Sequence, residues 1–511
     1  MAEYLLAHDL GTSGNKATLY DTAGKLVGSA VYEYPTLYPH ERWVEQDPCQ
    51  WWNAVCSTTR ALLEKTGIPA SQVLCVSFSA QMMGCLLVDQ GGVPLRNMIT
   101  WADSRANEQE QWMLGQIGMD RGYRITGHRI SASYSAAKLL WVRDNEPELY
   151  RSAYKMLNAK DYIIFRLTGN FVTDYSDASG TNLLDIEKRA WSDDLIEAFD
   201  IRRDLLPELH PSSDIAGTVS PEAARECGLA AGTPVVIGGG DGSCACVGAG
   251  VVTEGKAYNV IGTSSWISSA AKRPFFDSGM RTFNWVHLDP TLVTPCGTMQ
   301  AAGLSYQWYR NTICRGEDLR AAESGRSVYA LLDEEAEQAR PGAGGVLYLP
   351  YLVGERSPLW NLDARGAFIG LHAATTRGEM TRAVLEGVGF NLKLILDVFE
   401  SERSLDSIVM IGGGAKGHVW LQILADIWQK TLYVPALMEE ATSMGAAICG
   451  GVGIGLYGSF ESCNTLNPPI REIRPNSANQ AVYGSLYTVF QKTYESLVPT
   501  YSMLANHNQI Y

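Results

Sequence analysis

Apolar and polar positions near the start of the chain predict two strands joined by a tight turn. An apolar run at residues 5–7 leads to Asp9, and an alternating run begins after Gly11-Thr12-Ser13-Gly14. Glycines at the tip leave the backbone N–H groups uncovered, and with the two hydroxyl groups they form a cradle suited to phosphate oxygens. Asp9, directly before the turn, is placed to hold a hydrated Mg²⁺ near such oxygens. The alternative for this stretch alone is an ordinary N-terminal hairpin.

The same local patterns occur a second time. Ile261-Gly262-Thr263-Ser264 repeats the Gly-Thr-Ser turn, and a buried-strand pattern followed by three glycines occurs within residues 236–241 and again within 410–415. Each of these two glycine segments precedes a predicted helix. Two pairs of segments in the same order indicate two similar halves that face each other across a cleft.

The pattern between these segments predicts further strands and helices. A helix begins at Pro48, directly after Asp47, and carries tryptophans of the core. A buried strand at residues 73–79 leads to Gln81 and Met82, and the carboxyl end of a central strand is a usual place for a ligand contact. Other helices are predicted within residues 133–145 (capped by serines), 316–342, 377–400, 419–424 and 483–497, and loops at 174–181 and 348–358.

Trp101, Asp103 and Arg105 alternate along the chain. If this segment is extended, the three side chains point to the same side. An aromatic ring beside a carboxylate and a guanidinium suits a small polyhydroxylated molecule, because the ring packs on C–H groups while the charged groups bond to hydroxyls. The alternative is an ion pair beside a tryptophan of the core.

Length and charge limit the class of protein. A chain of 511 residues is too long for one hydrophobic core and predicts at least two large domains. A formal net charge of −14 without a basic stripe argues against a nucleic-acid partner, but it allows an anionic nucleotide held by Mg²⁺ and backbone dipoles. The sequence has neither the pattern of a signal peptide nor the roughly twenty apolar residues of a membrane span. We therefore expect neither nucleic acid nor membrane as a partner.

The eleven cysteines are scattered and include no Cys-x-x-Cys pair. Cys244 and Cys246, the closest two, are expected to be small buried side chains rather than metal ligands. Free thiols are typical of a reducing compartment, so we expect a cytoplasmic protein.

Several segments together resemble the FGGY family of carbohydrate kinases. Residues 133–145 resemble its first signature and residues 366–386 its second. The resemblance runs from residue 5 to about residue 455 and includes, in the family's order, Asp9-Leu10-Gly11-Thr12-Ser13, Gly240-Asp241, Gly262-Thr263 and Gly412-Gly413-Gly414-Ala415.

The resemblance implies an α/β fold of two ribonuclease-H-like domains, the architecture of sugar kinases, actin and Hsp70, with an interdomain cleft. We therefore expect an N-terminal domain at residues 1–249, on the sugar and phosphate side. The C-terminal domain, on the nucleotide side, is expected at residues 250–511. The implied activity is transfer of a phosphoryl group from ATP, with Mg²⁺, to a hydroxyl of a small sugar.

The family also implies roles for individual residues. Asp241 resembles the general base, and Asp9 the anchor of Mg²⁺ through water. Lys16 either adds positive charge near the phosphates or is a solvated strand residue. Arg356 is a weaker substrate candidate, and Glu386 is expected to be a buried structural carboxylate. The remaining expected contacts are Gly11, Thr12, Ser13, Gly262 and Thr263 for phosphates, Gly303, Gln307, Gly413, Gly414 and Ala415 for the nucleotide, and Gln81, Met82, Trp101 and Asp103 for the sugar.

The sugar-contacting segments resemble the xylulokinase branch of the family, with two departures. Met83 stands where histidine is typical, and Gly242 stands where asparagine follows the base. Fewer polar side chains alter discrimination between polar substrates, so we expect D-xylulose or a related ketose or polyol, with ribulose and erythritol as alternatives.

A second hypothesis is a non-catalytic sensor of sugar or nucleotide on the same fold. The presence of both Asp9 and Asp241 argues against it, because a sensor needs neither a base nor a metal anchor. Homodimers are common in the family, so a homodimer also stays open.

Overall fold

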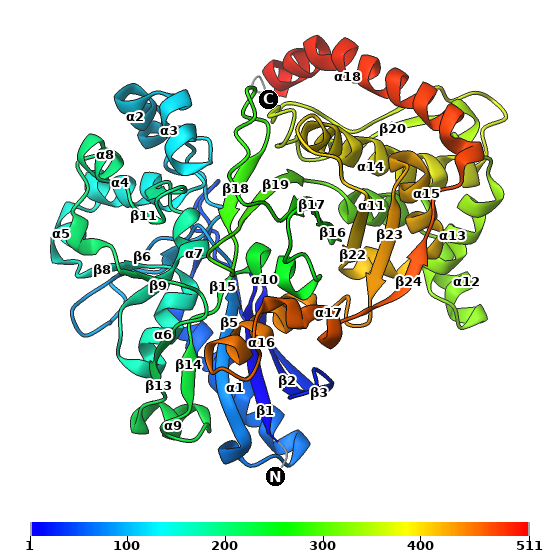
Figure 1. The fold of residues 1–511 in the computed structure, drawn as a ribbon. Helices are drawn as coiled ribbons and strands as arrows, with labels where there is room; N and C mark the ends of the chain where they lie inside the picture. The colour runs from blue at the N-terminus through cyan, green and yellow to red at the C-terminus, as the bar shows by residue number, and fades with distance from the viewer. Residues whose placement is uncertain (1–2, 509–511) are drawn as a thin grey trace.

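A computed structural model describes residues 3–508 as two α/β halves lying side by side (Figure 1). A seven-stranded mixed sheet forms the centre of each half. In the first, the order is β13-β14-β5-β1-β2-β3, and β15 also pairs with β5. The strands of this sheet are β1 (Tyr4–Leu10), β2 (Gly14–Asp21), β3 (Leu26–Glu33), β5 (Val73–Ala80), β13 (Ile215–Thr218), β14 (Pro234–Val236) and β15 (Gly239–Gly240).

The second sheet has the order β18-β19-β17-β16-β22-β23-β24. Its strands are β16 (Ala257–Ile261), β17 (Ser265–Ser269), β18 (Phe283–Val286), β19 (Val293–Met299), β22 (Ser407–Ile411), β23 (Thr431–Pro435) and β24 (Pro469–Ile473). Two-stranded pairings elsewhere involve β4 (Glu45–Gln46), β6 (Leu86–Val88), β7 (Met98–Ile99), β8 (Lys155–Leu157), β9 (Val172–Asp174), β10 (Leu184–Asp185), β11 (Ala190–Trp191), β12 (Glu208–His210), β20 (Leu347–Leu349) and β21 (Ala367–Ile369).

The two large sheets share one pattern. Strands β1 and β2 form an antiparallel hairpin, and β5 runs parallel to β1. Strands β16 and β17 form the corresponding hairpin, and β22 runs parallel to β16. Both tips are closed by a hydrogen bond of 2.9 Å, from Gly11 N–H to the Gly14 carbonyl and from Gly262 N–H to the Ser264 carbonyl. The predicted duplication is therefore confirmed.

Helices surround both sheets, and two of them begin as the sequence predicts. Helix α1 starts at Pro48 because the Asp47 carboxylate accepts the Cys49 N–H, and α14 starts with a capping box formed by Thr376 and Glu379. Among residues 3–508, no helix combines the length and apolar character needed to cross a bilayer. The helices are α1 (Pro48–Thr66), α2 (Asn107–Ile117), α3 (Met119–Thr126), α4 (Ser135–Asn145), α5 (Pro147–Ser152), α6 (Ala159–Thr168), α7 (Tyr175–Ser179), α8 (Asp193–Ala198), α9 (Pro221–Cys227), α10 (Asp241–Gly248), α11 (Gly303–Ile313), α12 (Glu317–Ser324), α13 (Val328–Gln338), α14 (Arg377–Glu400), α15 (His418–Trp428), α16 (Ala441–Gly453), α17 (Cys463–Leu466) and α18 (Gln480–Asn508).

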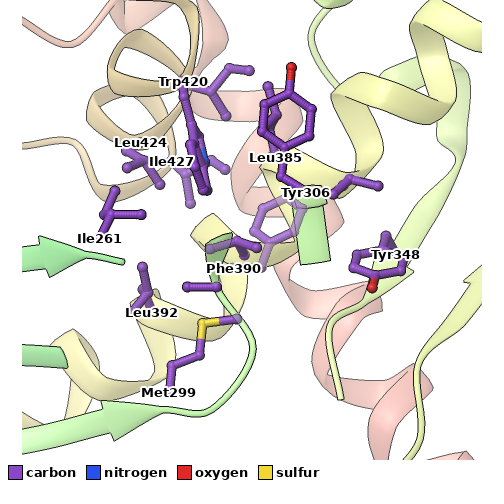
Figure 2. Close-up of a cluster of buried hydrophobic side chains, with 14 of the residues drawn as sticks. Ile261, Met299, Tyr306, Tyr348, Leu385, Phe390, Leu392, Trp420, Leu424 and Ile427 are labelled. Atoms are coloured by element: carbon purple, nitrogen blue, oxygen red, sulfur yellow. The ribbon is translucent and has the colours of Figure 1, made fainter. Parts of the chain in front are cut away.

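The largest hydrophobic cluster lies in the second half, between its sheet and the helices that cover it. Figure 2 shows Trp420 of α15 close to Tyr306 of α11, with Phe390 of α14 below them. The rings of Tyr306 and Trp420 pack edge to face, with their centroids 5.8 Å apart. This packing holds α11 and α15 in fixed positions relative to the second sheet.

Helix α16 belongs to the second half by sequence but packs against α10 and the first sheet. It is the orange helix beside β5 in Figure 1. A Cβ atom at Gly445 would lie 1.9 Å from the Cys244 carbonyl oxygen, and one at Gly248 would lie 1.7 Å from that of Ala441. The two helices therefore approach so closely that only glycine fits at these crossings. The boundary at residues 249/250 stays a prediction.

Several sequence predictions differ from the structure. Residues 174–181, predicted as a loop, contain α7, because the Asp174 carboxylate accepts the N–H groups of Ser176 and Asp177. The first signature helix begins after Tyr134 without a serine cap. Helices α15 and α18 are longer than predicted because apolar packing continues past the predicted ends.

Glu386 is the buried structural carboxylate that the sequence predicts. Its Oε1 accepts hydrogen bonds from Arg382 Nε (2.7 Å), Tyr483 OH (2.8 Å) and Gly342 N–H (3.0 Å). These bonds join α14, α18 and the loop before β20 within one core.

Replacing Glu386 with Ala is expected to lower the free energy of unfolding by about 3 kcal/mol, because it leaves the charge of the buried Arg382 without an anionic partner. Urea unfolding measures this change, with exposed Glu402→Ala as the control. Unchanged stability combined with lost turnover would instead assign Glu386 to the chemistry.

Candidate active site

Two carboxylates meet at the carboxyl ends of neighbouring strands in the first sheet. In the β1–β5 register Asp9 lies opposite Ser79, and in the β15–β5 register Gly240 lies opposite Ala80. Asp241 follows Gly240 as the first residue of α10. The strand ends therefore bring Asp9 and Asp241 to the same edge of the sheet, where α/β proteins usually bind ligands.

Burial determines the protonation of both carboxylates. Burial, together with the charge of Asp9 and against the hydrogen bond from the Gly242 N–H, raises the pKa of Asp241 to about 7. Burial also raises the pKa of Asp9, against a hydrogen bond from Ser79 Oγ (2.8 Å) and the charge of Lys16. An Asp241 carboxylate that titrates near neutral pH is suited to accept a proton from a substrate.

A cavity of about 520 Å³ opens in front of Asp241, and we call it the substrate cavity. Of the predicted sugar contacts, Gln81, Met82 and Trp101 line it, and so does Arg356. Oε1 of Gln81 is buried and accepts no hydrogen bond, although Nε2 donates to Gln46 at 2.7 Å. Gln81 therefore has an acceptor available for a ligand hydroxyl.

Asp103 is placed differently from the other sugar candidates. Residues 101–105 form turns instead of the extended segment predicted, because the Asp103 carboxylate accepts the Arg105 N–H at 2.9 Å. It also accepts Val44 N–H (2.6 Å) and pairs with the Arg105 guanidinium (2.7 Å). Asp103 does not line the substrate cavity. The segment is therefore not extended, and of the two alternatives the structure shows the ion pair, between Asp103 and Arg105.

An aromatic wall, contributed by the second half, was not predicted. It contains Tyr258, Trp266, Phe283, Trp285 and, beside them, Cys296. Trp266 Nε1 donates to Tyr258 OH (2.8 Å), which donates to the Gly242 carbonyl (2.7 Å). This chain of bonds ties the wall to the residue after Asp241. The sequence contains one signal for this wall: Trp266 lies next to the second Gly-Thr-Ser turn.

The two departures from the xylulokinase branch, Met83 and Gly242, both line the substrate cavity. Met83 has a φ of 64°, and its carbonyl accepts Lys138 Nζ at 2.7 Å. Lys138, from the first signature, also donates to the Ser133 carbonyl, and burial lowers its pKa to about 7. Through Lys138, the first signature therefore fixes the backbone at Met83. The sequence did not indicate this role.

A second cavity of about 640 Å³ lies on the other side of the second hairpin tip, and we call it the nucleotide cavity. Thr263 lines both cavities, so they adjoin there. Ala415 is buried behind the glycine turn, and its carbonyl accepts a hydrogen bond from Arg471. The predicted residues that line the nucleotide cavity are Gly262, Thr263, Gly303, Gln307, Gly413 and Gly414.

Only one of the three residues predicted to bind phosphates at the first hairpin tip lines a cavity. Thr12 lines the substrate cavity, and its Oγ1 accepts Trp101 Nε1 at 2.9 Å. Gly11 and Ser13 complete the tip without lining either cavity. Lys16 faces Asp9 in the hairpin register and forms an ion pair with Glu440 (3.1 Å) at the start of α16. It therefore links the two halves.

The residues present fit a nucleotide and a magnesium ion. A Cβ at Gly413 would meet no atom within 4 Å, so the turn is open to the nucleotide cavity. One Asp9 oxygen accepts a hydrogen bond from Ser79, and the other has no partner in residues 3–508. That part of the chain has no cluster of three His, Cys, Asp or Glu side chains suited to a metal. A single carboxylate with waters and phosphate oxygens is a usual environment for Mg²⁺.

Comparison with known proteins identifies the family. The model of the FGGY carbohydrate kinase N-terminal domain matches residues 4–248, and that of the C-terminal domain matches residues 257–454. The chain belongs to the FGGY family of carbohydrate kinases. The predicted family and fold class are therefore confirmed.

Individual relatives differ in the substrate that they are named for. The chain is 34% identical to a xylulose kinase of Bacillus subtilis over 96% of its own length and 97% of the relative. It is 30% identical to a gluconokinase of the same species, over 100% and 99% of the two chains. A solved xylulose kinase from Lactobacillus acidophilus superposes with a TM-score of 0.90 at 26% identity. The match covers 98% of this chain and 100% of the solved one. The chain is thus a sugar kinase.

Proposed function

We propose that this kinase phosphorylates a hydroxyl of a small open-chain carbohydrate bound in the substrate cavity, with Asp241 as the general base. The supporting observation is a buried carboxylate, with a pKa raised to about 7 by burial, at the wall of a cavity that adjoins the nucleotide cavity at Thr263. The substrate class includes polyols, ketoses such as D-xylulose and sugar acids such as gluconate; relatives are named for xylulose and for gluconate.

In this proposal, Asp241 orients the substrate hydroxyl and accepts its proton late in the transfer, because phosphoryl transfer is loose. The N–H groups of the two hairpin tips and of the glycine turn at Gly413 orient the phosphates. Asp9 holds Mg²⁺ through water, and the ion supplies positive charge that offsets the charge of the phosphates when bound. The aromatic wall keeps water away from the hydroxyl and so limits hydrolysis of ATP.

The pH dependence of turnover follows from the raised pKa of Asp241. Because the base is active only when deprotonated, kcat/KM is expected to fall about tenfold per pH unit below about pH 7 and to level off above it. Steady-state rates from pH 5 to 9 measure this. The residual rate of the Asp241→Asn variant should not show this fall below pH 7. A flat profile from pH 5 to 7 in the wild-type enzyme would contradict the assignment.

ADP release with Mg²⁺–ATP and a panel of ketoses, polyols and sugar acids tests the proposed function. We expect release that depends on the carbohydrate. If no member of the panel supports turnover while ATP binds, the kinase proposal fails and a sensor explains the site better.

Location and assembly are separate proposals. All eleven cysteines are free thiols, ten of them buried, which supports a cytoplasmic location. A homodimer stays a prediction, and light scattering of the purified protein measures the mass directly.

A further inference from the structure

Three hydrogen-bond donors cluster beside the substrate cavity without an acceptor in residues 3–508. The Arg356 guanidinium, which lines the cavity, forms no hydrogen bond or ion pair there; its carbon lies 5.9 Å from the centre of the Trp360 ring. The Arg129 guanidinium lies 4.9 Å from the same ring and likewise has no acceptor. The indole N–H of Trp360 is buried and unpaired. Both arginines are half-exposed and so reachable from solvent, and a ligand carboxylate would supply the acceptor that residues 3–508 do not.

The carboxylate that adjoins Arg356 in the sequence, that of Glu355, forms its hydrogen bonds with other groups. Glu355 precedes Arg356, but its Oε1 accepts the N–H groups of Gln300 and Arg356, both at 2.9 Å. Its Oε2 accepts Asn391 Nδ2 at 2.7 Å. These bonds occupy both oxygens of Glu355, which forms no ion pair with the Arg356 guanidinium, although burial raises the pKa of Glu355 and the charge of Arg356 opposes this rise. Arg356 at the cavity, and Arg129 across the Trp360 ring from it, therefore have no ion-pair partner among residues 3–508.

The substrate cavity is lined by one carboxylate, that of Asp241, and by one guanidinium, that of Arg356. Burial raises the pKa of Asp241, and the neighbouring charge that adds to the shift is Asp9. Burial raises the pKa of Tyr134 to about 12, and the neighbouring charge that opposes the shift is Arg356. Both Asp241 and Tyr134 line the cavity. A ligand in this cavity therefore meets both the Asp241 carboxylate and the Arg356 guanidinium.

We propose that the substrate is a sugar acid, whose carboxylate binds Arg356 with support from Arg129 while a hydroxyl of the same molecule lies at Asp241. This inference rests on the proposed function and narrows its substrate class to the anionic members. A guanidinium offers two parallel N–H groups that match the two oxygens of a carboxylate. Gln81 in the same cavity offers an acceptor for a hydroxyl, so the guanidinium is the group that distinguishes an acid from a neutral sugar.

The first test compares two substrates that differ only at the charged group. Gluconate and its neutral reduction product glucitol are compared with D-xylulose by ADP release. We expect kcat/KM for gluconate to exceed that for glucitol at least about tenfold, the usual effect of one charge-assisted hydrogen bond. Preference for D-xylulose or glucitol would overturn the inference but leave the kinase proposal intact. Absence of turnover with every compound would contradict the proposed function itself.

Variants test which residues bind the carboxylate. Arg356→Met should raise the KM for gluconate by about 10- to 100-fold and leave the KM for ATP unchanged. Arg356→Lys should recover part of the loss, and Arg129→Met should show a smaller one. The control is Arg474→Met, an exposed arginine that lines neither cavity. An equal loss with neutral substrates, or a raised KM for ATP, would overturn the assignment of Arg356 to a substrate carboxylate.

Discussion

Replacing Asp241 with Asn is expected to lower kcat about 10³-fold, within the range of effects measured for a general base. The amide has nearly the same shape but cannot accept the proton of the substrate hydroxyl. Because Asp241 begins α10 at the edge of the sheet, the fold and the nucleotide cavity should be unaffected. Steady-state ADP release measures kcat, and titration calorimetry measures ATP binding.

The matched control is Asp406→Asn, an exposed aspartate in the second half. It should retain the wild-type kcat. If Asp241→Asn kept more than about one tenth of the wild-type rate, a general base worth 10²-fold or more would be excluded at this position.

Replacing Gly445 with Ala is expected to lower the free energy of unfolding by about 3 kcal/mol. The new methyl carbon would overlap the Cys244 carbonyl oxygen, which lies 1.9 Å away and belongs to the backbone of α10. The helices must separate, and α10 carries Asp241 at its N-terminus. We therefore expect kcat to fall together with stability, as measured by urea unfolding and ADP release.

Gly484→Ala provides a control within a helix of the same chain. Gly484 lies in α18, and an added Cβ would meet no atom within 4 Å. Alanine there should stabilise the protein by roughly 0.5–1 kcal/mol through its higher helix propensity. Equal effects of the two substitutions would contradict the close contact between α10 and α16.

Features that depend on local sequence could be predicted. The two Gly-Thr-Ser turns and the two glycine segments follow apolar strands, and the structure places them at corresponding edges of two similar sheets. Helix α14 begins where the sequence predicts because its capping box lies within four consecutive residues. The predicted nucleotide contacts share one cavity, apart from Ala415 behind it.

Features that depend on distant partners could not be predicted. Asp103 binds the backbone of Val44, a residue far away in the sequence, and this bond turns the carboxylate away from the cavity. Trp285 and Phe283 have the pattern of ordinary buried strand residues, so their place in a ligand cavity depends on how the halves meet. Helix α16 is apolar on all sides, and periodicity does not indicate which sheet such a helix covers.

Phosphorus NMR of a reaction with ATP, Mg²⁺ and the preferred carbohydrate tests the central claim most directly. It observes the product itself. We predict a new phosphomonoester signal that grows in step with ADP and that is lost with Asp241→Asn. Inorganic phosphate in place of the ester, or no reaction with any carbohydrate, would contradict phosphoryl transfer to a substrate hydroxyl at Asp241.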